Sequence, residues 1–213
     1  MEKIKRSSIR SYRQFCSFTR ALDVVGDRWN LLIVRELLPG PLRYNDLKAS
    51  LAGIATNLLA ERLRSLEEHL IIERRLGDTG VFYALTPWGA ELREPIAALA
   101  RWGAPLMKTG RGGDSFQPRW LAVALPALLR GATAAPALEL GLQVEGVLVV
   151  LHIDRSGPRV DAQPNRLPDT VLTAAPEIVL GLAAGALTID QAVSAGHLQG
   201  DTEILRRAFP ALR

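Results

Sequence analysis

Cysteine is the scarcest residue in this sequence of 213 residues and occurs once, at position 16. A single cysteine excludes an intramolecular disulfide, so the fold must be stabilised without one. The first fifteen residues are polar and basic and lack the apolar run of a signal peptide. The longest apolar stretches, 120–129 and 171–187, are short or interrupted, whereas a membrane span needs ~18 to 20 uninterrupted residues. These absences predict a cytoplasmic protein without a membrane partner.

Catalytic signatures are missing as well. The sequence contains no HExxH, CxxC or GxSxG motif and no phosphate-binding glycine loop. Its three histidines are His69, His152 and His197. His69 follows the acidic pair Glu67-Glu68 near the end of an expected helix, and His152 lies beside Asp154 in an expected apolar strand. Scattered groups of this kind usually have structural roles, so we expect no enzyme, no cofactor and no metal site. An enzyme built on the C-terminal region is the weakest alternative.

The composition is that of an ordinary globular protein, with 48% hydrophobic and 23% charged residues, and the length suits one large domain or two smaller ones. The charge is uneven. Residues 1–110 contain 17 Lys and Arg against 12 Asp and Glu, whereas residues 111–213 contain 9 against 10. A polyanionic partner is therefore expected in the first half. The basic arm over 1–13 has two interpretations that the sequence favours equally: it contacts a phosphate backbone, or it is a frayed terminus.

Hydrophobic periodicity and capping residues give the order of elements in the first half. A helix from residue 15 stops at Gly26, and Asp27 is expected to cap the next helix. A short helix over 44–51, a long helix over 56–70 and a hairpin of strands 71–76 and 81–85 follow. Thr86 and Pro87 begin a last helix, whose apolar stripe is Leu92, Ile96, Leu99, Trp102 and Leu106, with Pro95 as a kink. This order is typical of a winged helix-turn-helix.

The helix expected over 56–70 has two distinct sides. An inner stripe is formed by Leu59, Leu63, Leu66 and Leu70. The opposite side carries Asn57, Glu61, Arg64 and Glu68. In a recognition helix, Asn57 is suited to an adenine edge, Arg64 to guanine or a phosphate, and Arg62 on the flank to a phosphate. The alternative is a solvated helix face with Glu–Arg pairs, and periodicity alone does not separate the two.

Three further arginines occupy positions where winged helices contact phosphates. Arg74 and Arg75 are neighbours in the first strand of the hairpin, so one of them faces away from the core. Arg43 precedes the short helix, whose N-terminus favours anions. Each is a weak signal alone, because a single exposed arginine is usually only solvated.

Several segments of the first half resemble the HxlR family of winged-helix regulators. They are residues 16–29 (CSFTRALDVVGDRW), 31–38 (LLIVRELL), 40–47 (GPLRYNDL), 53–63 (GIATNLLAERL) and 83–89 (YALTPWG). The resemblance covers about residues 15–107. It implies a homodimer built through the first and last helices of the module and bound to a two-fold site on double-stranded DNA.

By match to these motifs, the resemblance places Thr56, Asn57 and Arg62 at the start and flank of the recognition helix and Arg75 in the wing. Where the family often has serine this chain has Ala55, so Thr56 is a possible cap instead. Cys16 aligns with a cysteine that is redox-responsive in some members; the alternative, which we favour, is a small buried hydrophobic residue at the dimer seam.

The second half is expected to be α+β, after a glycine-rich linker over 110–113. A helix over 120–129 precedes a hairpin of strands 138–144 and 147–153 that turns at Glu145-Gly146. Short strands over 159–162 and 170–173 and helices over 176–184, 189–195 and 201–209 follow.

Two segments of this half resemble the sterol carrier protein fold, namely 176–185 (PEIVLGLAAG) and 195–201 (AGHLQGD), before a last helix with Arg206 and Phe209. The resemblance implies an apolar tunnel that takes small hydrophobic ligands. We therefore expect a winged-helix domain over 1–110 and a small α+β domain over 114–213. The expected function is a DNA-binding regulator modulated by an apolar effector. The alternative is a lipid or small-molecule carrier whose winged helix makes protein contacts.

Overall fold

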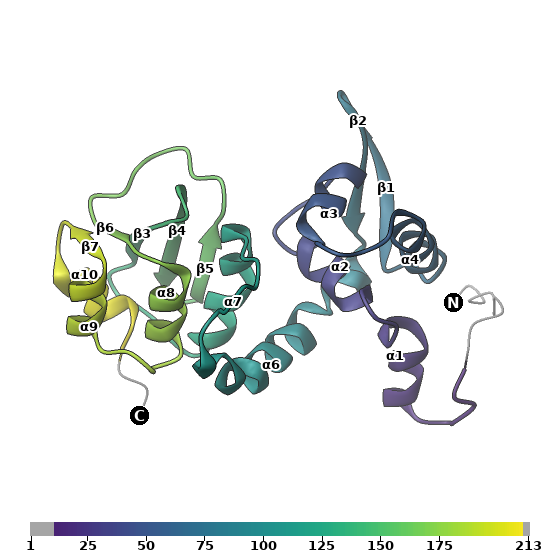
Figure 1. Ribbon diagram of the computed structural model, residues 1–213, viewed down its shortest axis with the longest axis horizontal. Helices are drawn as coiled ribbons and strands as arrows, with labels where there is room; N and C mark the ends of the chain where they lie inside the picture. The colour runs from purple at the N-terminus through teal and green to yellow at the C-terminus, as the bar shows by residue number, and fades with distance from the viewer. Residues whose placement is uncertain (1–10, 211–213) are drawn as a thin grey trace. The chain divides into compact units, whose positions relative to one another are not determined.

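The computed structural model describes residues 11–210. The chain forms two compact units that divide between Arg93 and Glu94 (Figure 1). Within 11–210, no helix is both long and apolar enough to cross a bilayer. Residues 1–10 of the expected basic arm, with Lys3, Lys5, Arg6 and Arg10, lie outside the described residues.

The first unit is a winged helix-turn-helix, as the order of elements predicts. Its elements are α1 (Ser17–Val25), α2 (Asn30–Leu37), α3 (Tyr44–Ser50), α4 (Thr56–Glu68), β1 (Ile72–Gly77), β2 (Gly80–Leu85) and α5 (Pro87–Ala90). Strands β1 and β2 pair as an antiparallel hairpin that extends beyond the helices (Figure 1). Leu42, just before α3, forms a backbone bridge to Tyr83 and ties the wing to the helices.

The core of this unit lies where α2, α3 and α4 meet the base of the wing. Fully buried side chains come from each element: Ile33, Leu47, Leu59, Leu63, Leu66 and Ile72. Each stabilises the fold by roughly 1.5–3 kcal/mol relative to an exposed side chain. The expected caps at Gly26 and Thr86 are confirmed, because Gly26 ends α1 and the Thr86 hydroxyl accepts a hydrogen bond from the Gly89 N–H. The apolar contacts of α4 with the core thus come from one side of the helix.

Two details of the sequence prediction are wrong. Leu70 does not extend the inner stripe of α4: its side chain is 61% exposed, and its backbone turns at φ 58. The chain must reverse direction there to begin β1 at Ile72, which overrides the helical periodicity. Asp27 does not cap α2, which begins after Trp29 without a side-chain cap; its carboxylate instead pairs with Arg62 of α4.

The long helix expected after Thr86 is interrupted. It consists of α5, then α6 (Arg93–Gly103) and the 3-10 turn η1 (Ala104–Thr109). The break precedes Pro95, because the proline ring clashes with the carbonyl of Glu91 in a continuous helix. The predicted apolar stripe is buried only at Ile96, whereas Leu99, Trp102 and Leu106 are 51, 76 and 70% exposed. An apolar face of α6 and η1 is therefore uncovered in the single chain.

The second unit is a five-stranded sheet packed with helices. After the 3-10 turn η2 (Pro118–Trp120) its elements are α7 (Leu121–Leu128), β3 (Leu138–Val144), β4 (Val147–Asp154), β5 (Gly157–Asp161), β6 (Val171–Thr173), α8 (Pro176–Ala183), α9 (Ile189–Ala195), β7 (His197–Gln199) and α10 (Thr202–Ala208). The strand order is β5-β4-β3-β6-β7, antiparallel except for β3 and β6. The expected turn at Glu145-Gly146 is confirmed, with φ of 50 and 80.

One face of this sheet and the helices enclose a continuous apolar core (Figure 1). Alternate residues of β3, such as Leu140 and Leu142, are fully buried and face Leu151 and Val149 of β4. The parallel pairing of β6 with β3 and the short strand β7 were not predicted, because strands of three residues carry too little periodicity.

Candidate nucleic-acid interface

The N-terminal end of α4 is exposed. Thr56 is its first helical residue and lies with Asn57 on the surface, whereas Leu59 is fully buried two residues later. The cap position is Ala55, which has no side-chain acceptor, so the expectation that Thr56 caps the helix is wrong. The Asn57 side chain accepts a hydrogen bond from the Leu58 N–H at 3.0 Å. Unshared N–H groups at such a helix end favour an anionic partner.

Helix α3 fixes the segment that leads into α4. The Tyr44 hydroxyl donates to the Thr56 carbonyl at 2.8 Å, and the Lys48 ammonium donates to the Ile54 carbonyl. Sequence analysis did not identify this role for Tyr44 or Lys48. The available signal was their spacing of four residues on one side of a short helix, next to the glycine-containing turn before α4.

Arg64 faces outward from the middle of α4. It has no ion-pair partner among residues 11–210, and it lines a groove of about 690 Å³. Glu61 and Glu68 of α4 line the same groove, as do Tyr12 and Asp23 from the segment before α1 and from α1 itself. The predicted outward side of α4 is thus exposed, and acidic side chains flank its arginine.

Arg62 is positioned differently from the other predicted contacts. Its side chain is only 18% exposed, and Nη1 pairs with Asp27 and, at 3.6 Å, with Glu61. The sequence places it on the flank of α4, and the structure turns it toward the loop between α1 and α2 instead of leaving it open.

Arg74 and Arg75 lie on opposite faces of the wing. Arg75 lies directly across from Phe82, and Arg43 places its guanidinium 5.1 Å from the centre of the same ring. Residues opposite each other in a hairpin share a face, so Arg43 and Arg75 come together on the α3 side of the wing. Arg75 also pairs with Glu73 at 2.6 Å, whereas the Arg43 guanidinium has no acidic partner among the described residues.

Arg74 occupies the other face of the wing, toward α4. Its Nε donates to Glu67 of α4 at 2.8 Å, and this hydrogen bond raises the pKa of the Arg74 guanidinium. Both arginines of the wing remain more than half exposed in spite of their acidic partners. Exposed pairs of this kind are weak, so a phosphate can replace the carboxylate.

Cys16 is exposed at the N-cap of α1 in the single chain, and its burial at a dimer seam stays a prediction. Hydrogen bonds from the backbone N–H groups of Thr19 and Phe18 lower the pKa of its thiol from the ordinary 9.0. A lowered thiol pKa increases the thiolate fraction, which is the nucleophilic form.

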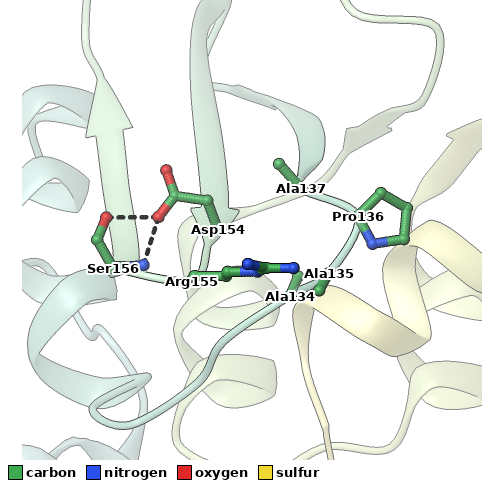
Figure 2. Close-up of a pocket in the computed structure, with 7 residues that line it drawn as sticks. All are labelled: Ala134, Ala135, Pro136, Ala137, Asp154, Arg155 and Ser156. Carbon is green, nitrogen blue, oxygen red and sulfur yellow. Dashed lines mark hydrogen bonds between the residues drawn. The ribbon is translucent and has the colours of Figure 1, made fainter.

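The second unit has a shallow pocket of about 710 Å³, open to solvent, between the β4–β5 turn and the segment before β3 (Figure 2). The Asp154 carboxylate accepts hydrogen bonds from the Ser156 N–H and hydroxyl, and the side chain of Arg155 extends toward Ala135. The pocket mixes polar and apolar groups. No group of three or more His, Cys, Asp or Glu within residues 11–210 is arranged to hold a metal ion.

Comparison with known proteins identifies the first unit. The family model described as HxlR-like helix-turn-helix matches residues 24–110. The HTH-type transcriptional regulator YodB of Bacillus subtilis is 34% identical over 93 residues, which are 42% of this chain and 83% of that relative. The chain belongs to the HxlR-like helix-turn-helix family.

Other members show the same extent of similarity. The HTH-type transcriptional regulator YtfH of Escherichia coli is 33% identical over 94 residues, which are 43% of this chain and 75% of YtfH. Among solved structures, quinone-bound YodB from B. subtilis is 33% identical and covers 41% of this chain and 96% of its own, with a TM-score of 0.38. The HxlR-like relatives are named as transcriptional regulators, and the segment matched by the family model contains α4 and the wing.

Proposed function

We propose that this HxlR-like protein is a transcription regulator that binds double-stranded DNA with α4 and the wing of its first unit. The observation that carries the proposal is the division of α4 into two sides. Leu59, Leu63 and Leu66 anchor the helix in the core, while Thr56, Asn57 and Arg64 remain exposed. A helix held in this way can enter the major groove while its leucines stay packed in the core.

Within this proposal the residues have separate roles. Asn57 reads an adenine edge, and Arg64 contacts guanine or a phosphate near it. Thr56, at the helix N-terminus, binds a phosphate together with the free backbone N–H groups. Arg43 and Arg75 neutralise phosphates on one side of the wing, and Arg74 does so on the other.

We further infer that the active form is a homodimer. Trp102 and Leu106 are uncovered on α6 and η1, as are Phe15 and Phe18 at α1, which are 105 and 70% exposed. Large apolar side chains left exposed are typical of protein interfaces. A two-fold dimer would bind two half-sites about 34 Å apart. Analytical ultracentrifugation tests this inference: Trp102→Asp should give monomers, and an unchanged dimer would contradict it.

A fluorescence anisotropy titration tests DNA binding. The full chain is titrated with its own upstream DNA and with random DNA of equal length at several salt concentrations. We expect selective binding whose affinity falls steeply with salt, because each neutralised phosphate releases counterions. Equal affinity for the two DNAs would contradict the proposal and would favour the alternative, a carrier protein whose winged helix makes protein contacts.

The second unit is proposed to bind a small apolar effector, in the manner of a sterol carrier-like domain. Support comes from its architecture, a sheet whose inner face and four helices enclose one apolar core. Because this core is filled by its own side chains, an effector must displace some of them, and it alters DNA affinity only if it favours one state of the protein. Native mass spectrometry of freshly purified protein tests the proposal, since an effector of sufficient affinity should co-purify.

Cys16 offers a second means of control. Its exposure and lowered thiol pKa favour reaction with electrophiles. The rate of alkylation by iodoacetamide should reach half its maximum at a lower pH than that of free cysteine. Cys16→Ser is the matched control, and loss of DNA affinity on alkylation of the native chain alone would support regulation through this thiol.

A further inference from the structure

Arg62 and Asp27 connect the middle of α4 to the loop between α1 and α2. The two residues are 35 positions apart, and the Arg62 guanidinium pairs with the Asp27 carboxylate through Nη1. The Arg62 side chain is 18% exposed, against 56% for Asp27. Its Nε is buried and has no hydrogen-bond partner among the described residues. The arginine is therefore held on the scaffold side of α4, and only its far end reaches the carboxylate.

The helical repeat explains why Arg62 turns inward. At about 100° per residue, position 62 lies roughly 60° from Leu59 and beside Leu66, at the edge of the buried stripe. Arg64 is further round the helix and lies in the open. Two arginines of one helix thus have different surroundings, although the sequence predicts DNA contact for both.

The loop that carries Asp27 is itself constrained. Trp29 has φ 84, a left-handed conformation that is rare for an aromatic residue, and the Arg28 guanidinium lies 5.4 Å from its ring centre. The buried Asn30 side chain donates to the Val24 carbonyl at 2.9 Å, across the same loop. A strained backbone persists only where its surroundings hold it in place. Asp27 is thus presented to α4 from a fixed position.

From this geometry we propose that Arg62 is a positioning residue for DNA recognition and not a phosphate contact: its ion pair with Asp27 sets the orientation in which α4 enters the major groove. The inference rests on the proposed function, which makes α4 the recognition helix. A phosphate on Arg62 would have to displace Asp27 and would then lie next to that carboxylate. Base readout by Asn57 depends on the angle of α4, whereas phosphate neutralisation depends mainly on charge.

The two roles predict opposite effects for Asp27→Asn. If the carboxylate only adds negative charge near the DNA, its removal raises affinity for any sequence, because the repulsion falls. If it orients α4, its removal lowers affinity for the specific site and leaves affinity for random DNA unchanged or slightly higher. Whether Asp27→Asn raises or lowers affinity for the specific site therefore separates the two roles, whatever the size of the change.

The test compares the full-length wild type, Asp27→Asn, Arg62→Gln and the double variant by anisotropy on specific and random DNA at several salt concentrations. We expect each single variant to lose about tenfold in specific affinity, and the double variant to lose no more than either, as for two members of one interaction. The salt dependence should stay the same. A phosphate contact at Arg62 would instead lower both affinities together and reduce the salt slope by about 1.

Controls keep a loss of folding apart from a loss of orientation. Asp190→Asn removes an exposed acidic charge of the second unit, outside the proposed DNA interface, and it should not reduce specific affinity. Arg62→Lys keeps the charge, should retain part of the pairing and should recover part of the selectivity. Far-UV circular dichroism confirms that each variant is folded.

The outcomes are distinct. Suppose that the wild type binds its specific site selectively. This inference is then overturned if Arg62→Gln loses affinity equally for both DNAs, or if Asp27→Asn gains affinity for the specific site, and the proposed function still stands. A wild type that does not distinguish the two DNAs would overturn both.

Discussion

The two units of this chain differ in what their arginines contact. In the first unit, Arg62, Arg74 and Arg75 are paired, but the guanidinium groups of Arg43 and Arg64 have no acidic partner within residues 11–210. These two groups lie beside the wing and on the outer side of α4. In the second unit, Arg111 pairs with Glu145, Arg159 with Asp154 and Arg166 with Glu139. Pairing within the chain neutralises a cation, whereas an unpaired cation is available to a phosphate.

This difference gives the charge asymmetry of the sequence a location. A small positive excess over 110 residues can be solvated surface and nothing more, but here the two unpaired guanidinium groups lie on the exposed side of α4 and beside the wing. The second unit instead encloses its apolar residues in a core and pairs several of its arginines with acidic residues, while the exposed Arg155 has no acidic partner within residues 11–210. We infer that polyanion binding belongs to the first unit alone.

The largest effect is expected from opening a cavity under α4. Leu66 and Leu140 are both fully buried, the first beneath α4 and the second in the core of the sheet. Leu66→Ala and Leu140→Ala should each lower the free energy of unfolding of their own unit by about 2–5 kcal/mol. Calorimetry measures the unfolding and anisotropy the DNA affinity. Leu66→Ala should weaken DNA binding, whereas Leu140→Ala should leave it unchanged at a temperature where the protein is folded. Equal losses of DNA affinity would mean that the units are not functionally separate.

Local sequence signals predicted most of the helices and strands of both units. Gly26 ends α1, Thr86 caps α5, and Glu145-Gly146 forms the tight turn between β3 and β4, because each of these depends on a few adjacent residues. Where the structure departs from the prediction, a distant partner is responsible. Asp27 has the chemistry of a helix cap, yet Arg62 on another helix binds its carboxylate.

Sequence analysis predicted only part of the candidate site, because some of its contacts join residues that are distant in the sequence. Periodicity identified the exposed side of α4, including Asn57 and Arg64, since exposure follows from the buried leucines. It did not reveal that Arg62 turns inward or that Tyr44 fixes the start of α4, because both depend on contacts between elements. Leu70 was misassigned because tertiary structure ended the helix two residues earlier.

A smaller effect, confined to sequence selectivity, is expected at Asn57. Asn57→Ala should remove one base-specific contact and reduce discrimination by about 1–3 kcal/mol at one or two base pairs. Selection of bound sequences from a random DNA pool measures the change. The matched control is Asn165→Ala, an exposed asparagine of the second unit, which should not alter the selected sequence. Equal weakening of specific and random DNA by Asn57→Ala would refute its role in base readout.

The effect at Arg75 should be uniform across sequences. Its guanidinium is 56% exposed and lies on the same face of the wing as Arg43. Arg75→Ala should weaken all DNA alike and lower the salt slope of binding by about 1, because one fewer phosphate is neutralised. Arg155→Ala, at an exposed arginine of the second unit, should leave the slope unchanged. A change in slope from Arg155→Ala would place part of the DNA contact on the second unit.

The smallest effect is expected at two carboxylates, one in each unit. A hydrogen bond from the Tyr12 N–H, ahead of others from Ser11 and Arg20, lowers the pKa of Asp23 from its ordinary 3.8. Hydrogen bonds from Ser156 lower the pKa of Asp154 in the same way. Because the folded pKa lies below the unfolded one, each carboxylate stabilises the fold above about pH 4, and this contribution is lost as the pH falls through the folded pKa.

Urea unfolding of the wild type, Asp23→Asn and Asp154→Asn near neutral pH and near pH 3 measures this contribution. Each variant should be slightly less stable than the wild type near neutrality, and the difference should shrink in acid, where the wild-type carboxyl is also uncharged. A difference that is independent of pH would assign the role of that residue to packing and not to charge. Since Asp23 alone of the two holds the Ser11–Tyr12 segment beside the groove along α4, only Asp23→Asn should also change DNA affinity. A change in affinity from Asp154→Asn would show that the charges of the second unit act on DNA binding as well, and the functional separation of the two units would then fail.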